Sequence, residues 1–244
     1  MSTNASIAIL KKDGTIDLAY CHHDGYLIDG VGETLLNHYK DAESIKDLIS
    51  GGAIDSLGVT KESTEFYGRD DNCTSFKNIE SYHEAYKEEY NYLFDEKTNS
   101  WEFSKGYGEK SFKPLTQQAI NGAREQVVYN FIKERDSHPR DVKLRKDIIE
   151  EHLVKGADFE NIKNLFKPYD LSKQVSPHGQ EKFDYAQEVA KKIALKNKLQ
   201  DDFKQELDVK LPEKDSYEDM MRKLGIQHKD KQEQPITRAG KIKV

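Results

Sequence analysis

The chain has 244 residues, a length that suits one or two domains, with 36% hydrophobic residues, 34% charged residues and a formal net charge of -6. Thirteen tyrosines, ten phenylalanines and one tryptophan argue against a disordered chain. Two cysteines exclude a disulfide scaffold, and the polar N-terminus and short apolar runs predict neither a signal peptide nor a membrane span. We therefore expect a cytoplasmic protein with reduced thiols.

Charge is spread unevenly along the chain. Residues 1–114 carry 12 basic and 21 acidic side chains, whereas the remaining residues carry 26 basic and 23 acidic ones. The acidic first half argues against a nucleic-acid partner there, because nucleic-acid affinity depends largely on Lys and Arg. Three roles stay open for it: binding of a basic partner, imitation of nucleic-acid charge, and simple solubility.

The first half of the chain alternates strand and helix patterns. Strands are predicted at residues 5–10, 16–20, 64–68, 90–94 and 100–103, and helices at 31–39, 42–49 and 79–86. Asp13-Gly14 is a hairpin signal between the first two strands, and Asp41 is an N-cap signal. Residues 55–58 read as a turn. Residues 1–114 therefore predict an α+β head domain with a small antiparallel sheet and two or three helices.

After Pro114 the pattern becomes helical. Helices are predicted at residues 115–135, 142–154, 158–166, 177–207 and 217–224, with Asp158 as an N-cap and Pro177 in a first turn. Residues 115–225 thus form a helical domain or helical arms, and residues 226–244 a flexible charged tail. The apolar stripes of these helices are thin, so they need a partner surface: one another, the head, or another protein.

A candidate ligand site lies where two predicted strands end. Its residues are Tyr20, His22, His23, Asp24 and Tyr26 after the second strand, and Tyr67, Arg69 and Asp70 after the third. Arg69 is the only arginine in the first 114 residues, and a guanidinium binds carboxylate or phosphate in a bidentate manner. The alternative is structural: capping and hydrogen bonding in a tight turn, and a local ion pair of Arg69.

Other chemistry is less well supported by the sequence. A metal held by His22, His23 and Asp24 needs a further ligand such as His38, Asp70 or His83, and no Cys-x-x-Cys or His-Glu-x-x-His spacing occurs. Removal of Met1 would expose the amine of Ser2, which loosely resembles N-terminal-nucleophile hydrolases. The common nucleotide and hydrolase motifs are absent. We therefore assign no catalytic residue, no metal and no cofactor.

Several blocks of the first half resemble a family of small, largely uncharacterised proteins of phages and plasmids. The blocks are Ser6-Ile7-Ala8-Ile9, Tyr20-Cys21-His22 with Asp24-Gly25-Tyr26, Gly30-Val31-Gly32, Phe66-Tyr67-Gly68-Arg69-Asp70, and Glu89-Tyr90-Asn91-Tyr92-Leu93-Phe94. The resemblance covers residues 1–114 and implies a mobile genetic element as the source. It transfers no activity and no catalytic residue. The helical part is an extension that short members of this family lack.

Two functions are expected in this order. The first is a non-enzymatic accessory protein of a phage or plasmid, which binds a host or element-encoded protein, for example to inhibit a defence system. The second is a head that binds or hydrolyses a small phosphorylated ligand, with Arg69 on the phosphate and His22 or His23 as general acid or base. A virion or assembly component is a third possibility with no specific sequence feature in its favour.

Overall fold

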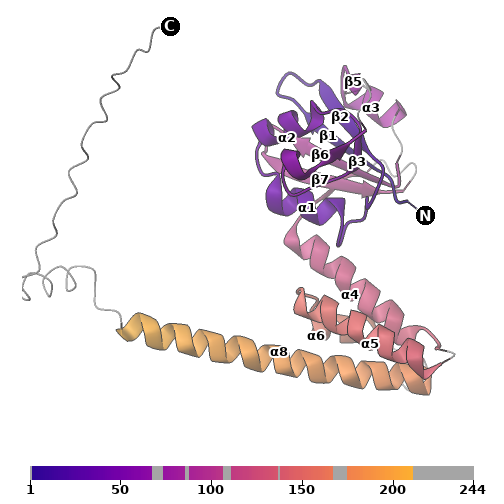
Figure 1. The fold of residues 1–244 in the computed structure, drawn as a ribbon, viewed down its shortest axis with the longest axis vertical. Helices are drawn as coiled ribbons and strands as arrows, with labels where there is room; N and C mark the ends of the chain where they lie inside the picture. The colour runs from indigo at the N-terminus through magenta and orange to yellow at the C-terminus, as the bar shows by residue number, and fades with distance from the viewer. Residues whose placement is uncertain are drawn as a thin grey trace, which may run out of the picture. The chain divides into compact units, whose positions relative to one another are not determined.

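The structure is a computed structural model that describes residues 2–67, 74–85, 88–106, 111–136, 138–166 and 175–210 (Figure 1). The chain divides into two units, Met1–Lys192 and Ile193–Val244. The predicted α+β class with a helical C-terminal part is confirmed. The predicted helix at 217–224 and the tail lie outside the described residues.

The head contains one mixed sheet with strand order β4-β3-β2-β1-β6-β7-β8, and β5 pairs with β2 beside this path. Its elements are β1 (Ala5–Leu10), β2 (Ile16–Cys21), α1 (Val31–His38), α2 (Ala42–Ile49), β3 (Ile54–Ser56), the 3-10 helix Lys61–Ser63, β4 (Glu65–Phe66), β5 (Thr74–Phe76), α3 (Ile79–Ala85), β6 (Tyr90–Asp95), β7 (Ser100–Lys105) and β8 (Lys113–Pro114). The hairpins β1–β2 and β6–β7 are antiparallel, as predicted.

Two pairings correct the expectation of a purely antiparallel sheet. β1 pairs with β6 in parallel over its whole length, and β2 meets β3 in parallel at Cys21 and Ile54. The two hairpins are thus joined along their first strands. A parallel pair requires a long crossover connection, and residues 11–89, which include β2, connect β1 to β6. Because β1 and β6 lie far apart in the sequence, the alternation of apolar and polar residues within each strand does not indicate whether the two strands pair parallel or antiparallel.

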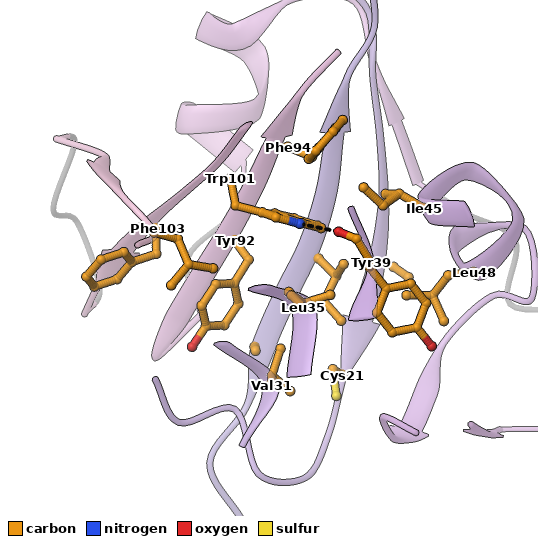
Figure 2. Close-up of a cluster of buried hydrophobic side chains, with 14 of the residues drawn as sticks. Cys21, Val31, Leu35, Tyr39, Ile45, Leu48, Tyr92, Phe94, Trp101 and Phe103 are labelled. Carbon is orange, nitrogen blue, oxygen red and sulfur yellow. Dashed lines mark hydrogen bonds between the residues drawn. The ribbon is translucent and has the colours of Figure 1, made fainter. Parts of the chain in front are cut away.

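Side chains alternate between two hydrophobic clusters, one on each face of the sheet. Ile7, Ile9, Tyr92 and Phe94 belong to the larger cluster, which also contains residues of α1 and α2 (Figure 2). Ala8 and Leu93 point the other way, into a smaller cluster with Tyr82 of α3. The sheet is therefore covered by helices on both faces.

A buried hydrogen bond ties the larger cluster to the end of α1. The indole Nε1 of Trp101 donates to the carbonyl oxygen of Tyr39 at 2.7 Å, shown as the dashed line in Figure 2. The side chain of Asp41, next but one in the chain, accepts hydrogen bonds from the backbone N–H groups of Glu43 and Ser44. Asp41 is thus the N-cap of α2, as its sequence position predicts.

The helical part begins with α4 (Gln117–Lys133), followed by α5 (Pro139–Val154), α6 (Phe159–Leu165) and α8 (Pro177–Lys210). Asp158 caps α6 through its side chain, and Pro139 and Pro177 are the first residues of their helices, where a missing N–H costs little. The rings of Phe159, Phe166 and Phe183 meet, which packs the first half of α8 against α6. These helices therefore cover much of one another's apolar surface.

A group of charged residues joins the head to α4 and α5. The guanidinium of Arg124 is fully buried, and its Nη2 donates to Glu33 at 2.6 Å and to Asp29 at 3.4 Å. Lys155, the residue directly after α5, also pairs with Asp29, at 2.6 Å. Ile120 of α4 belongs to the larger head cluster. The head thus covers part of the apolar surface of α4.

His152 of α5 is nearly buried beside this group. Burial lowers its pKa below the usual value, with the charges of Arg124 and Lys155 acting in the same direction and those of Asp29 and Glu151 opposing them. Its Nδ1 and two guanidinium nitrogens of Arg124, Nε and Nη1, are buried and have no hydrogen-bond partner among the described residues. The junction is therefore held by ion pairs that leave several buried polar atoms unsatisfied.

Candidate functional site

Backbone pairing with β3 positions the histidine pair. β2 ends at Cys21, but the backbone N–H of His22 still donates to the carbonyl of Ile54, and that of His23 to the carbonyl of Asp55, both at 3.0 Å. On the other side of β3, the N–H of Tyr67 donates to the carbonyl of Ala53 at 2.9 Å. The short strand β3 thus lies between the two predicted segments and holds one of them on each side.

The side chains of these segments form one group, the imidazole–phenol cluster, which comprises Tyr20, His22, His23, Asp55 and Tyr67. The hydroxyl of Tyr20 and Nδ1 of His22 are hydrogen-bonded at 3.0 Å. The rings of His22 and His23 lie 4.4 Å apart edge to face, and the ring of Tyr67 lies 5.9 Å from His22. The structure therefore brings together four of the eight predicted site residues.

Asp55 is the member of the cluster that the sequence did not reveal. Its Oδ1 lies 3.6 Å from Nε2 of His23, and its hydrogen bond with the hydroxyl of Tyr67 raises the pKa of that phenol to about 12. The segment 55–58 was expected to be a turn, and its first two residues instead belong to β3. An apolar run of only Ala53 and Ile54 before Asp55 is too short to signal a strand.

The remaining predicted residues have other positions. Asp24 adopts a left-handed backbone conformation with φ 55°, and its carbonyl accepts from the N–H of Val31 at 2.8 Å, so this residue shapes the turn into α1. The ring of Tyr26 lies 6.3 Å from that of Tyr90, away from the cluster contacts. Arg69 and Asp70 lie outside the described residues.

Neither nucleophile near the cluster is paired with a base. The thiol of Cys21 is fully buried, and burial raises its pKa to about 12, so it stays protonated and unreactive at neutral pH. The hydroxyl of Ser2 donates to the backbone carbonyl of His22 and not to an imidazole. Within the part of the chain that the structure describes, no group of three or more His, Cys, Asp or Glu side chains is arranged to hold a metal ion.

The cluster is partly exposed to solvent. The side chain of His23 is 45% exposed and that of Asp55 34%, and Tyr67 is among the exposed large hydrophobic residues. Its rings contact one another edge to face, an arrangement that aromatic pairs favour. The arrangement offers a surface of aromatic rings, phenol hydroxyls, imidazole nitrogens and the carboxylate of Asp55.

Comparison with protein-family models, with curated proteins and with solved structures finds no match for this chain. No described helix is long and apolar enough to cross a membrane. The resemblance of the head to phage and plasmid proteins stays a prediction.

Proposed function

We propose that the protein is a non-enzymatic binding protein whose head docks on a basic surface of another protein through the imidazole–phenol cluster. The observation that carries this proposal is the partly exposed and mutually paired state of the cluster: its rings contact one another and Asp55, and no described nucleophile is activated beside it. Tyrosine is enriched at protein interfaces, where it contributes a large contact area and a hydroxyl group.

The charge of the head supports a basic partner. Residues 1–114 carry nine more acidic than basic side chains, and Asp55 lies within the cluster itself. Complementary charge accelerates association and excludes partners of like charge, with an effect that salt weakens. The resemblance to phage and plasmid proteins supports a mobile genetic element as the source. The partner is then a host or element-encoded protein of the host cytoplasm, such as a component of a defence system.

A pull-down from bacterial lysate with the tagged full chain tests the proposal. We expect a basic protein in stoichiometric amount, captured by the wild type and by Tyr26→Ser but not by Tyr67→Ser. The two variants make the same change at exposed tyrosines, one outside and one inside the cluster. Capture should fall steeply between 0.05 and 0.5 M NaCl, because added salt shortens the Debye length and so screens the attraction between the acidic head and the basic partner. Equal capture by both variants, or binding indifferent to salt, would contradict the proposal.

A second candidate is binding or hydrolysis of a small phosphorylated ligand by the head. The specific observation in its favour is the 3.6 Å contact of His23 with Asp55, since a neighbouring carboxylate orients an imidazole for general acid or base chemistry. Calorimetric titration with inorganic phosphate and with a nucleoside monophosphate tests this candidate, with His23→Asn as the comparison. Heat of binding that disappears in His23→Asn would support it, and no binding at millimolar ligand would exclude it.

A further inference from the structure

The second half of α8 exposes a row of large apolar side chains. Leu195, Leu199 and Phe203 are 60%, 61% and 64% exposed, and they follow one another at four-residue steps, so they line one face of the helix. The buried residues of α8, by contrast, lie in its first half and include Lys182, Ala186 and Val189. Contiguous exposed apolar residues of this kind mark interaction sites more often than inert surface. We call the three residues the α8 stripe.

The charges around the α8 stripe are separated along the helix. Residues 191–198 contain four lysines and no acidic residue, whereas residues 201–208 contain four acidic residues and one lysine. Leu199 lies between the two groups. A second helix of the same sequence is complementary to this pattern only if it runs in the opposite direction.

We propose that the α8 stripe is an interface between two copies of this chain, paired antiparallel about Leu199. In this pairing Leu195 of one copy lies opposite Phe203 of the other, and the two Leu199 side chains meet at the two-fold axis. The lysine-rich segment 191–198 of one copy then lies alongside the acidic segment 201–208 of the other. A parallel pair would instead place lysine against lysine and carboxylate against carboxylate, which repel.

This pairing would make the protein bivalent. The contact rests on few apolar residues per helix, so the interface is at the small end for specific complexes and the dimer should be in equilibrium with the monomer. Two heads in one assembly bind a partner with two sites, or a dense array of partners, more tightly than one head does. The inference does not depend on the proposed function of the head, because α8 and the head are different surfaces.

Sedimentation equilibrium of the full chain at about 2 to 200 µM tests the association. We expect the mass to rise from monomer to dimer with concentration, and Leu199→Glu to raise the dissociation constant at least about tenfold, as loss of one buried leucine in each copy predicts. Asn197→Glu is the matched control: it adds the same charge at an exposed position about 200° around the helix from Leu199, away from the α8 stripe, and should leave dimerisation nearly unchanged. A wild type that stays monomeric throughout would overturn the proposal and assign the α8 stripe to a different protein or to another segment of the chain.

Spin labels distinguish the two orientations. A label at Glu188→Cys, in a Cys73→Ser background, lies 11 residues from Leu199, and Cys21 is buried and does not compete for the label. With a rise of 1.5 Å per residue, antiparallel pairing separates the two labels by about 33 Å, whereas parallel helices would hold them about 10 Å apart. A measured separation near 10 Å would refute the antiparallel arrangement even if the protein is dimeric.

Discussion

Replacing Arg124 by methionine is expected to destabilise the protein and to separate the unfolding of the head from that of the helices. The side chain is fully buried and joins α4 to Glu33 and Asp29 of the head. Methionine retains most of the aliphatic volume but removes the positive charge, so both carboxylates lose their partner on α4. Lys155, directly after α5, continues to pair with Asp29.

The magnitude follows from the exposure of the partners. Breaking a fully buried ion pair costs about 3–5 kcal/mol, whereas an exposed pair contributes about 0–1 kcal/mol. Here Arg124 is buried, but Glu33 is 26% exposed and Asp29 38%, so water can solvate the carboxylates that are left. Removing two unsatisfied guanidinium nitrogens also relieves a cost. We therefore expect a loss of about 2 kcal/mol, between the two limits.

Urea unfolding with two probes measures this effect. Trp101 is the single tryptophan and lies in the head core, so its fluorescence reports the head, while circular dichroism at the helix band reports mainly α4, α5, α6 and α8. In the wild type both probes should show one transition for the head and the helices joined to it. In Arg124→Met the helices should unfold at lower urea than the head.

The control is Arg140→Met, the same change at an exposed arginine of α5. A double-mutant cycle of Arg124→Met with Glu33→Gln isolates the pairwise term, which we expect at about 1–2 kcal/mol for a charge-assisted hydrogen bond. Unfolding midpoints equal to those of the wild type, or a coupling energy near zero, would refute the view that this ion pair joins the two parts.

Three further outcomes are expected. The folded protein lowers the pKa of His152 below 6.5, so on acidification the unfolded chain takes up a proton first. The contribution of His152 to the free energy of unfolding is therefore full above about pH 6.5 and falls as the pH is lowered through that value. In urea unfolding from pH 7.5 to 5.5, His152→Gln should flatten this pH dependence. Asp41→Ala should cost about 1 kcal/mol in Trp101 fluorescence unfolding, with Asp41→Asn losing much less, since the side chain caps α2. Gly25→Ala should cost about 1–3 kcal/mol in thermal unfolding, because an added Cβ would lie 2.8 Å from the backbone of Thr3 and Asn4, and an unchanged melting temperature would show that the turn can relax.

Local chemistry allowed much of the fold to be predicted. The Asp13-Gly14 hairpin, the caps at Asp41 and Asp158 and the N-terminal position of Pro177 are each signalled within a few residues of where they act. Strands and helices with clear periodicity were therefore located to within a few residues. The structure brings together the centre of the predicted site, where Tyr20, His22 and His23 share one short segment and meet Tyr67.

Features that depend on distant residues were not predictable from one sequence. Asp55 joins the cluster through a three-residue strand, too short for a pattern. Arg124 meets Glu33 across 91 positions, and nothing in the sequence near either residue indicates the other. The parallel pairing of β1 with β6 has the same origin. Each depends on tertiary packing, which decides the neighbours of a residue after its local structure is set.

The central position of β1 has a consequence for synthesis of the protein on the ribosome. β1 ends at Leu10 and its neighbour β6 begins at Tyr90, 80 residues later. At a translation rate of about 5–20 residues per second, roughly 4–16 s pass between the synthesis of β1 and that of β6. The β1–β2 hairpin can form early, but a lone hairpin is only marginally stable in water. During this interval the nascent chain exposes an unpaired β1 edge with Ile7 and Ile9, an expected binding site for a ribosome-associated chaperone.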